Sequence, residues 1–292
     1  MTKKETSSQK EFLIPSSLSD IAKILGANPD ALIMGGGIDI MNMRLESFSG
    51  AQSVISTTRV AELKKIFRNE YYIELGSAIT ISELMKTGKE HLAQILYEGF
   101  DELGPQSVKN WATIGGVLCT KEYRADCFVP LCAVGTEIEL RSFYQDGRRK
   151  SQRWLPLGSF CRTDGSLDLQ QGELMTRLRI PNEPWDLQYY CKMGTRYSTH
   201  GTILTLAIAA RINKNTINEF SLYIGNGKSH IFTSELLAEN LSGYNYPIKS
   251  SQIESANGLM TRFCQNMPKN FDPLTAYATK QTVLEFLLGM YE

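Results

Sequence analysis

The stretch from Gly104 to Leu131, GPQSVKNWATIGGVLCTKEYRADCFVPL, is the part of this chain from which the rest is most easily understood. It places a glycine pair, Gly115 and Gly116, directly after Thr113 and Ile114 and between apolar runs. Because glycine has no Cβ, its backbone reaches conformations closed to other residues and can lie against a bound group. A threonine hydroxyl and several amide N–H groups would then face a phosphate. The pattern predicts a phosphate-binding loop, although a glycine turn in a sheet protein has the same composition.

A second glycine-rich stretch lies earlier, at Met34-Gly35-Gly36-Gly37-Ile38-Asp39. It follows the apolar run 31–34, which predicts a strand, and precedes residues 41–45, which could form a helix. Strand, glycines and helix in this order are typical of phosphate binding. The spacing is not the dinucleotide fingerprint of a Rossmann fold, because the interrupted glycine pattern and the paired downstream acidic residue are both missing. A different fold therefore has to be considered.

Length and composition indicate a globular protein. The chain has 292 residues, enough to bury a large core and to form two domains. Its 31 basic and 31 acidic residues give no net charge, which favours neither nucleic acid nor an anionic membrane as a partner. Residues 1–10 lack the apolar core of a secretory signal, and the aliphatic run 203–210 is far shorter than the ~20 residues of a membrane span. We expect a soluble, cytoplasmic protein with no membrane contact.

The residues that most often carry chemistry are scattered. The six cysteines form no C-x-x-C pair, so no zinc site is expected. Cys127 and Cys132 are separated by four residues, as at the start of a plant-type ferredoxin pattern, but Gly135 stands where that pattern needs a third cysteine. We expect free thiols. The three histidines do not assemble into a Ser-His-Asp set. No catalytic residue and no metal ligand is predicted, and the chemistry would come from a bound cofactor.

Coarse patterns predict the order of helices and strands. Ser17 with Asp20, and Thr80 with Glu83, are helix-start patterns. From Val129 the pattern predicts strands, including a hairpin of 137–140 with 153–157. After the break at 181–184, the sequence predicts strands at 187–193, 204–212 and 220–225, and helices at 233–241, 253–267 and 273–290.

Taken together, the motifs resemble the FAD-binding subunit or domain of the molybdenum hydroxylases, the family of xanthine dehydrogenase, aldehyde oxidase and carbon monoxide dehydrogenase. The family's typical A-G-G-T-D-L loop corresponds to residues 35–40, and its I-G-A-x-T-x-x-E-L segment to 75–84. Its R-N-x-A-T-I-G-G-N segment corresponds to 109–117, and its S-A-D-x-x-x-P segment to 124–130. The resemblance continues through residues 154–160, 172–174 and 192–196. Two departures are Ile38 and Val117, which replace the family's usual threonine and asparagine.

The resemblance implies an α+β fold. Residues 1–11 would be a flexible tail, and residues 12–183 a FAD-binding domain of the PCMH, or vanillyl-alcohol-oxidase-like, type with two subdomains at about 12–66 and 67–183. Residues 184–292 would be a smaller α+β domain with a three-stranded antiparallel sheet and helices.

The resemblance also implies a noncovalently bound FAD. The two glycine loops would hold its pyrophosphate, Asp126 would hydrogen-bond toward the ribityl and flavin end, and Lys192 would lie beside the flavin, where a positive charge favours the anionic reduced ring. An exposed lysine at a strand end is the alternative for Lys192. The implied cofactor-binding residues are Met34, Gly35, Gly36, Gly37, Ile38, Asp39, Thr80, Thr113, Ile114, Gly115, Gly116, Asp126 and Lys192.

The function implied by the resemblance is that of an electron-transfer subunit in a multi-subunit oxidoreductase. Electrons would come from two-iron two-sulfur clusters on an iron-sulfur subunit, after oxidation of substrate at the molybdenum cofactor of a molybdopterin subunit, and would pass through FAD to NAD or another acceptor. An exposed face near Asp126 and Lys192 would contact the iron-sulfur chain. Two alternatives stay open: a stand-alone FAD-dependent oxidase or reductase, and a structural subunit that has lost FAD, which Ile38 and Val117 would favour.

Overall fold

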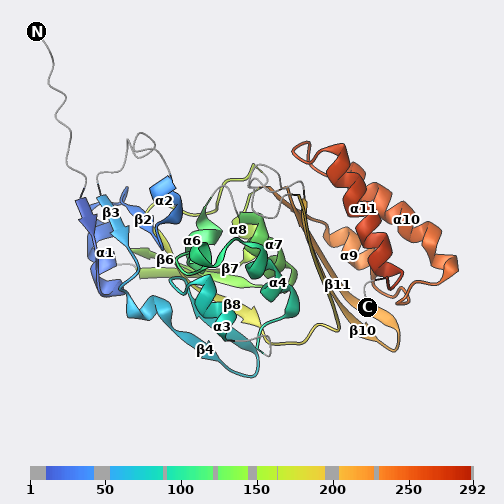
Figure 1. The fold of residues 1–292 in the computed structure, drawn as a ribbon, viewed down its shortest axis with the longest axis horizontal. Helices are drawn as coiled ribbons and strands as arrows, with labels where there is room; N and C mark the ends of the chain where they lie inside the picture. The colour runs from blue at the N-terminus through green and yellow to red at the C-terminus, as the bar shows by residue number, and fades with distance from the viewer. Residues whose placement is uncertain are drawn as a thin grey trace, which may run out of the picture.

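The structure is a computed structural model that describes residues 11–42, 53–87, 91–120, 124–143, 150–162, 164–194, 204–226 and 230–290. Three sheets and their helices form successive layers along the long axis of the molecule, from the small N-terminal sheet to the C-terminal helices (Figure 1). None of the described helices combines the length and the apolar character that a membrane span requires.

The first layer is a parallel sheet of three strands in the order β1-β3-β2. Its strands are β1 (Glu11–Leu13), β2 (Leu32–Met34) and β3 (Ser53–Ser56). Helix α1 (Leu18–Ala27) connects β1 to β2, and the predicted start is confirmed because Ser17 Oγ accepts the amide of Asp20 at 3.1 Å. The apolar side of α1 buries Ile21 and Leu25 in a small core with the strands. Strand β2 then leads directly into the first glycine loop and the short helix α2 (Ile38–Asn42).

The second layer is an antiparallel sheet of five strands in the order β4-β5-β8-β6-β7. The strands are β4 (Ile66–Arg68), β5 (Tyr72–Gly76), β6 (Glu137–Phe143), β7 (Lys150–Pro156) and β8 (Glu173–Pro181). One face of this sheet packs against helices, whose buried side chains form the main core. These helices are α3 (Ile81–Lys86), α4 (Gln94–Glu102), α5 (Gln106–Lys109), α6 (Ile114–Cys119), α7 (Arg124–Ala133) and α8 (Leu157–Phe160).

A four-stranded antiparallel sheet, β12-β11-β10-β9, lies on the other side of these helices (Figure 1). The strands are β9 (Leu187–Met193), β10 (Leu204–Asn213), β11 (Thr216–Gly225) and β12 (Ile231–Thr233). Successive side chains of a strand point to opposite faces. Accordingly, Ala207 and Ala209 join the main core, whereas Leu206 and Ile208 join a second core with α9 (Glu235–Leu241), α10 (Ser250–Gln265) and α11 (Pro273–Leu287). The sheet is therefore buried on both faces.

Three expectations differ from the structure. The C-terminal sheet has four strands instead of three, because the three-residue β12 pairs with β11 and is too short to show a pattern. Residues 127–134 belong mostly to α7 and are all buried, so their unbroken apolar run suggested a strand. Gly115 and Gly116 lie in the first turn of α6 and not in an open loop.

The division into domains at residue 184 stays a prediction, since the main core includes residues from both sides of it.

Candidate functional site

The first glycine loop joins the end of β2 to α2, and residues 34–40 are all partly exposed. Gly37 has a φ of 83°, in the left-handed region that favours glycine. Within the described part of the chain, the amides of Gly35, Gly36, Gly37 and Ile38 donate no hydrogen bond to a protein acceptor. Successive backbone N–H groups around a left-handed residue form a concavity that attracts anions. The loop can therefore receive a phosphate without breaking any hydrogen bond of the fold.

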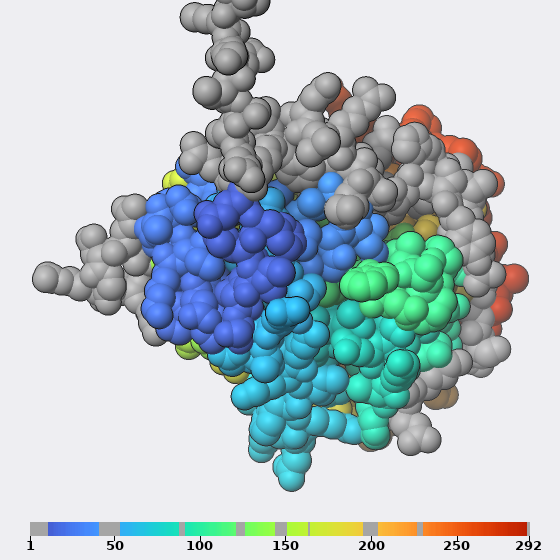
Figure 2. All heavy atoms as spheres, turned by 60° about the vertical axis from the view of Figure 1, so that its left-hand side comes forward, coloured from blue at the N-terminus to red at the C-terminus, as the bar shows by residue number. Residues whose placement is uncertain are grey.

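The backbone of the first glycine loop lies directly against the segment that carries the second. An ideal Cβ on Gly35 would lie 2.3 Å from Thr113 Oγ1, and one on Gly36 would lie 1.6 Å from the carbonyl oxygen of Trp111. Any larger residue at either position would push the first loop away from the segment before α6. Figure 2 shows the face of the molecule on which the N-terminal residues, in blue, lie beside residues of the five-stranded layer, in cyan and green. These two glycines thus bring the loops together.

The second loop uses its amides within the protein. Thr113 caps α6, because its Oγ1 accepts the amide of Gly116 at 3.2 Å. The amide of Ile114 donates to the carbonyl of Ile79 and that of Gly115 donates to the carbonyl of Ser77, both at 2.9 Å. These amides are therefore committed to the fold, and the amides available to a ligand lie in the first loop. The sequence patterns of the two loops are alike, but within the described residues only the first loop keeps a row of amides without a protein acceptor.

Gly116 is the exposed member of the second glycine pair. An ideal Cβ on Gly35 would lie 3.7 Å from the Cα of Gly116, so Gly116 stands beside the first loop. Asp39 is linked to the same helix, because the hydroxyl of Thr120, at the end of α6, donates to its carboxylate. The first turn of α2 is thus joined to the C-terminal end of α6 by Asp39 and Thr120, and the first loop lies against the N-terminal end of α6 at Gly35 and Thr113.

Thr80 has a structural role in the geometry observed. Its Oγ1 accepts the amide of Glu83 at 3.2 Å, and its own amide donates to the Glu83 carboxylate at 2.8 Å. This capping box begins α3, as the sequence predicts, and the hydrogen bond from the Thr80 amide holds the pKa of Glu83 below its usual value. Thr80 also pairs with Thr113 in an isolated antiparallel bridge. Through this bridge the capped helix supports the segment that carries the second loop.

Asp126 and Lys192 form a buried ion pair between α7 and β9. The Lys192 Nζ lies 2.7 Å from Asp126 Oδ2, and both side chains are 8% exposed. Lys192 also donates to the carbonyl of Glu102 at 3.2 Å, and Thr205 donates to Asp126 Oδ1 at 3.5 Å. Burial raises the pKa of Asp126, and the attraction of Lys192 opposes that rise. The pair brings together two residues that are far apart in the sequence.

The burial of this pair corrects one expectation. Lys192 is not an exposed lysine at a strand end. An exposed face near Asp126 and Lys192 that contacts an iron-sulfur chain stays a prediction. The neighbouring thiol of Cys127 and hydroxyl of Tyr190 are also buried, and burial raises the pKa of each well above its usual value. Both groups therefore stay neutral at physiological pH.

The two departures from the family pattern place apolar side chains against the main core. Val117 is 7% exposed and lies within that core, and the partly buried Ile38 packs against it. Neither side chain can accept a hydrogen bond from the four first-loop amides, because valine and isoleucine side chains contain only carbon and hydrogen. The replacements remove side-chain polar groups but leave the backbone donors.

Sequence reasoning missed two members of these networks. Thr120 follows a glycine helix that was expected to be a loop, so its position at a helix end was not foreseen. Thr205 is a hydroxyl within the aliphatic run 203–210, and it is fully buried against Asp126. A polar side chain inside an apolar strand usually has a buried partner, and this signal was available in the sequence.

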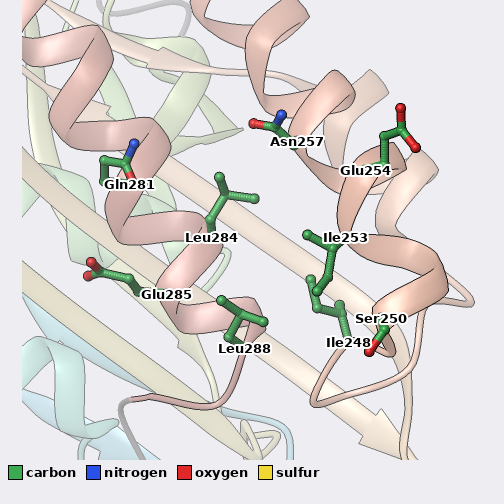
Figure 3. A pocket seen from close by; sticks show the side chains of 9 residues that line it. All are labelled: Ile248, Ser250, Ile253, Glu254, Asn257, Gln281, Leu284, Glu285 and Leu288. Atoms are coloured by element: carbon green, nitrogen blue, oxygen red, sulfur yellow. The ribbon is translucent and has the colours of Figure 1, made fainter.

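A cavity of about 530 Å³ lies elsewhere, between α10 and α11 (Figure 3). Its walls include Ile253, Leu284 and Leu288, and none of the predicted site residues lines it. Within the described residues, no cluster of three or more histidine, cysteine, aspartate or glutamate side chains is arranged to hold a metal ion.

Known proteins share both the sequence pattern and the fold. The xanthine dehydrogenase FAD-binding subunit of Escherichia coli O157:H7 is 23% identical over 215 residues, which cover 72% of this chain and 71% of that subunit. The nicotinate dehydrogenase FAD-subunit of Eubacterium barkeri is 22% identical over 208 residues, 70% of this chain and 69% of that subunit.

Solved structures show the same fold across nearly the whole chain. A chain of quinoline 2-oxidoreductase from Pseudomonas putida 86 superposes with a TM-score of 0.77 and 16% identity, covering 96% of this chain and 97% of that one. A chain of carbon monoxide dehydrogenase from Hydrogenophaga pseudoflava gives a TM-score of 0.76 and 18% identity, covering 96% and 94%. The expected α+β fold of the PCMH type is confirmed.

Residues 6–183 match the sequence profile of a family described as the FAD binding domain in molybdopterin dehydrogenase. This match includes both glycine loops and Asp126, and it covers most of the chain. The resemblance deduced from the motifs is confirmed, and the chain belongs to this family of FAD-binding oxidoreductase domains.

Proposed function

We propose that this chain is the FAD-binding, electron-transfer subunit of a cytoplasmic molybdenum hydroxylase complex of the xanthine dehydrogenase type. In such a complex, electrons pass from iron-sulfur clusters on a partner chain through FAD to NAD or another acceptor. A third chain carries the molybdenum cofactor, at which substrate is oxidised. The names of the relatives support this assignment, since those from Escherichia coli and Eubacterium barkeri are FAD subunits of dehydrogenases.

The observation that carries the proposal is the first glycine loop. Four successive residues, from Gly35 to Ile38, are partly exposed, and their amides make no hydrogen bond to a protein acceptor within the described residues. Buried or half-buried amides are normally paired, so an unpaired row of them fits a ligand that accepts several hydrogen bonds. A pyrophosphate has the required charge and oxygen atoms. The family match identifies FAD as the pyrophosphate-containing ligand.

We assign the site residues different tasks within this proposal. The first-loop residues, Met34 through Asp39, hold the pyrophosphate by their backbone. Thr113, Ile114 and Gly115 support that loop, with Thr80 behind them, and Gly116 leaves open the space beside it. FAD, when bound, supplies the redox chemistry that joins one-electron carriers to a two-electron acceptor.

Asp126 and Lys192 belong to the flavin end in this assignment. Their pairing fixes both charges in the protein interior, where electrostatic interactions are stronger than in water. A fixed ammonium group favours an anionic neighbour without having to reorganise. The thiol of Cys127 and the hydroxyl of Tyr190 stay protonated beside them.

Purification of the chain expressed alone, followed by addition of FAD and removal of excess ligand, tests the cofactor part of the proposal. The expected result is a yellow protein that transfers electrons from NADH to an artificial dye at most slowly. Co-expression with iron-sulfur and molybdopterin chains should yield a stable complex that oxidises purines or aldehydes.

Two results would support the alternatives instead. A well-folded protein that retains no FAD would favour a structural subunit that has lost the cofactor. Reduction of the dye by a purine or an aldehyde in the absence of any partner chain would favour a stand-alone flavoenzyme, because hydroxylation in this enzyme class needs a metal centre that the described residues do not form.

A further inference from the structure

Strand β9 presents alternate side chains to two different layers. Leu187, Tyr189 and Met193 pack against the core shared with α9, α10 and α11, whereas Tyr190 packs against the main core. Because side chains alternate along a strand, Gln188 and Lys192 share the face of Tyr190. This face of β9 lies against α4, and Lys192 reaches Asp126 in α7.

The three side chains on this face contact α4 from one end to the other. Gln188 Oε1 accepts the amide of Ile95 at 3.3 Å, in the first turn of the helix. In the middle, an ideal Cβ on Gly99 would lie 3.5 Å from Tyr190 Cε2. At the far end, Lys192 Nζ donates to the carbonyl of Glu102 at 3.2 Å.

The distance along β9 between Gln188 and Lys192 is similar to the length of α4 between the residues they contact. From Gln188 to Lys192 a strand advances about 13 Å, at roughly 3.3 Å per residue. From Ile95 to Glu102 a helix advances about 10 Å, at roughly 1.5 Å per residue. The pairing of β9 with β10, from Leu187 with Ala210 to Met193 with Leu204, fixes the register in which both helix ends are reached, and a shift of one residue would turn Gln188 and Lys192 to the opposite face.

Helix α4 needs an acceptor at its start. The first four amides of a helix have no partner within it, and a side chain at the N-cap usually satisfies one of them. The N-cap of α4 is Ala93, which makes no side-chain cap. Gln188, from a strand far along the sequence, supplies that acceptor to Ile95. The hydrogen bond from the Ile95 amide to Gln188 therefore caps α4 with a side chain from strand β9.

We propose that Gln188 is a positioning residue for the ion pair of Asp126 and Lys192: by capping α4 it fixes that helix along β9, whose register is set by its pairing with β10, and so holds the carbonyl of Glu102 where Lys192 Nζ can lie between it and Asp126. Lys192 lies at the C-terminal end of α4 and Asp126 in the first turn of α7, where the helix dipoles favour a cation and an anion respectively. The importance of this placement for flavin rests on the proposed function, whereas the placement itself does not.

Two substitutions separate the hydrogen bond from the volume of the side chain. Gln188→Met keeps the length of the side chain but removes both the acceptor and the Nε2 group that donates to the carbonyl of Trp185 at 3.4 Å. Gln188→Glu also loses that donor but keeps an acceptor for the Ile95 amide, so the difference between the two variants isolates the acceptor. Gln94→Met is the matched control, because Gln94 is exposed at the same end of α4 and donates to Glu98 on its own helix.

The first two measurements use flavin-free protein. Hydrogen exchange at the Ile95 amide reports the cap, and an NMR titration of the Asp126 carboxyl reports the position of Lys192. In Gln188→Met we expect exchange at Ile95 to be about tenfold faster, as for loss of a hydrogen bond of roughly average strength. The pKa of Asp126 should rise further, because Lys192, which lowers it, moves away. Gln188→Glu and Gln94→Met should resemble the natural protein.

The third measurement uses protein reconstituted with FAD. The dissociation constant of FAD should increase about five- to tenfold in Gln188→Met, and the flavin midpoint potential should change. The glutamate variant should restore both values. A purely structural role for Gln188 would lower stability without moving the potential.

Each outcome decides the proposal. Unchanged Ile95 exchange and an unchanged Asp126 pKa in Gln188→Met would overturn the role of Gln188 in placing the pair. Changes in both, with FAD affinity and potential unaltered, would overturn its relevance to flavin. If the natural protein binds no FAD, the proposed function fails by itself, and the two flavin-free measurements still decide whether Gln188 positions Lys192.

Discussion

Replacing Lys192 by methionine removes one member of the buried ion pair and leaves the Asp126 carboxylate, whose side chain is 8% exposed, without its cation. Breaking a buried pair in this way costs about 3–5 kcal/mol, most of it from the charge that stays behind. At about 2–4 °C per kcal/mol, the thermal midpoint should fall by about 6–20 °C. Thermal unfolding followed by circular dichroism in flavin-free protein measures this directly.

The chain offers a closely matched control in Lys109. Its Nζ lies 2.7 Å from Asp101 Oδ1 and its side chain is 7% exposed, but the Asp101 side chain is 46% exposed. Water can therefore solvate the carboxylate that Lys109→Met leaves behind, and we expect a loss of about 1 kcal/mol or less. Equal losses in the two methionine variants would refute the reasoning, because burial of the remaining carboxylate would then not matter.

The pH dependence supplies a second check on Lys192→Met. Burial raises the pKa of Asp126 in the folded state, and loss of Lys192 removes the attraction that opposes the rise. A group whose folded-state pKa is raised stabilises the fold below its unfolded pKa, and this contribution is lost as the pH rises through the folded pKa. The deficit of the variant should therefore shrink on acidification from neutral pH. Adding Asp126→Asn should also reduce it, since no buried charge then remains.

Gly116→Val should lower the FAD content of the purified protein, because Gly116 is exposed and a branched side chain would stand beside the first loop; full flavin absorbance in this variant would contradict the assignment of the phosphate site. It should also weaken the cap of α6, since an added Cβ would lie 2.8 Å from Thr113 Oγ1. Gly115→Ala, whose Cβ would lie 2.7 Å from the buried Ser77 Cβ, should lower the thermal midpoint as well, and FAD absorbance per folded protein then shows which variant affects binding beyond its effect on folding. Thr80→Ala should lower the free energy of unfolding by about 1 kcal/mol through loss of the cap on Glu83, as measured by urea denaturation. Acid precipitation should release all of the flavin into the supernatant, and colour that stays with the denatured protein would show a covalent link.

The sequence was most informative where local chemistry determines structure. The Ser17 and Thr80 helix starts and the β6–β7 hairpin depend on residues close in the chain, and all were foreseen. The roles of the two glycine loops were not distinguishable, because the carbonyls that occupy the second-loop amides come from Ser77 and Ile79, on a different segment. Similarly, motif positions indicated Asp126 and Lys192 separately, but no local pattern showed that the two side chains would pair.

The contact between the first glycine loop and the segment around Trp111 has a consequence for biogenesis. A nascent chain exposes Gly35 to Gly37 long before Trp111 and Thr113 are synthesised, and Lys192 emerges later still. Domains generally acquire their structure as units during or after synthesis. A ribosome-bound N-terminal fragment therefore contains the loop but not the surface that holds it in place. FAD insertion should accordingly begin only after the chain up to Lys192 has been synthesised, and an N-terminal fragment that ends before Trp111 should bind no FAD.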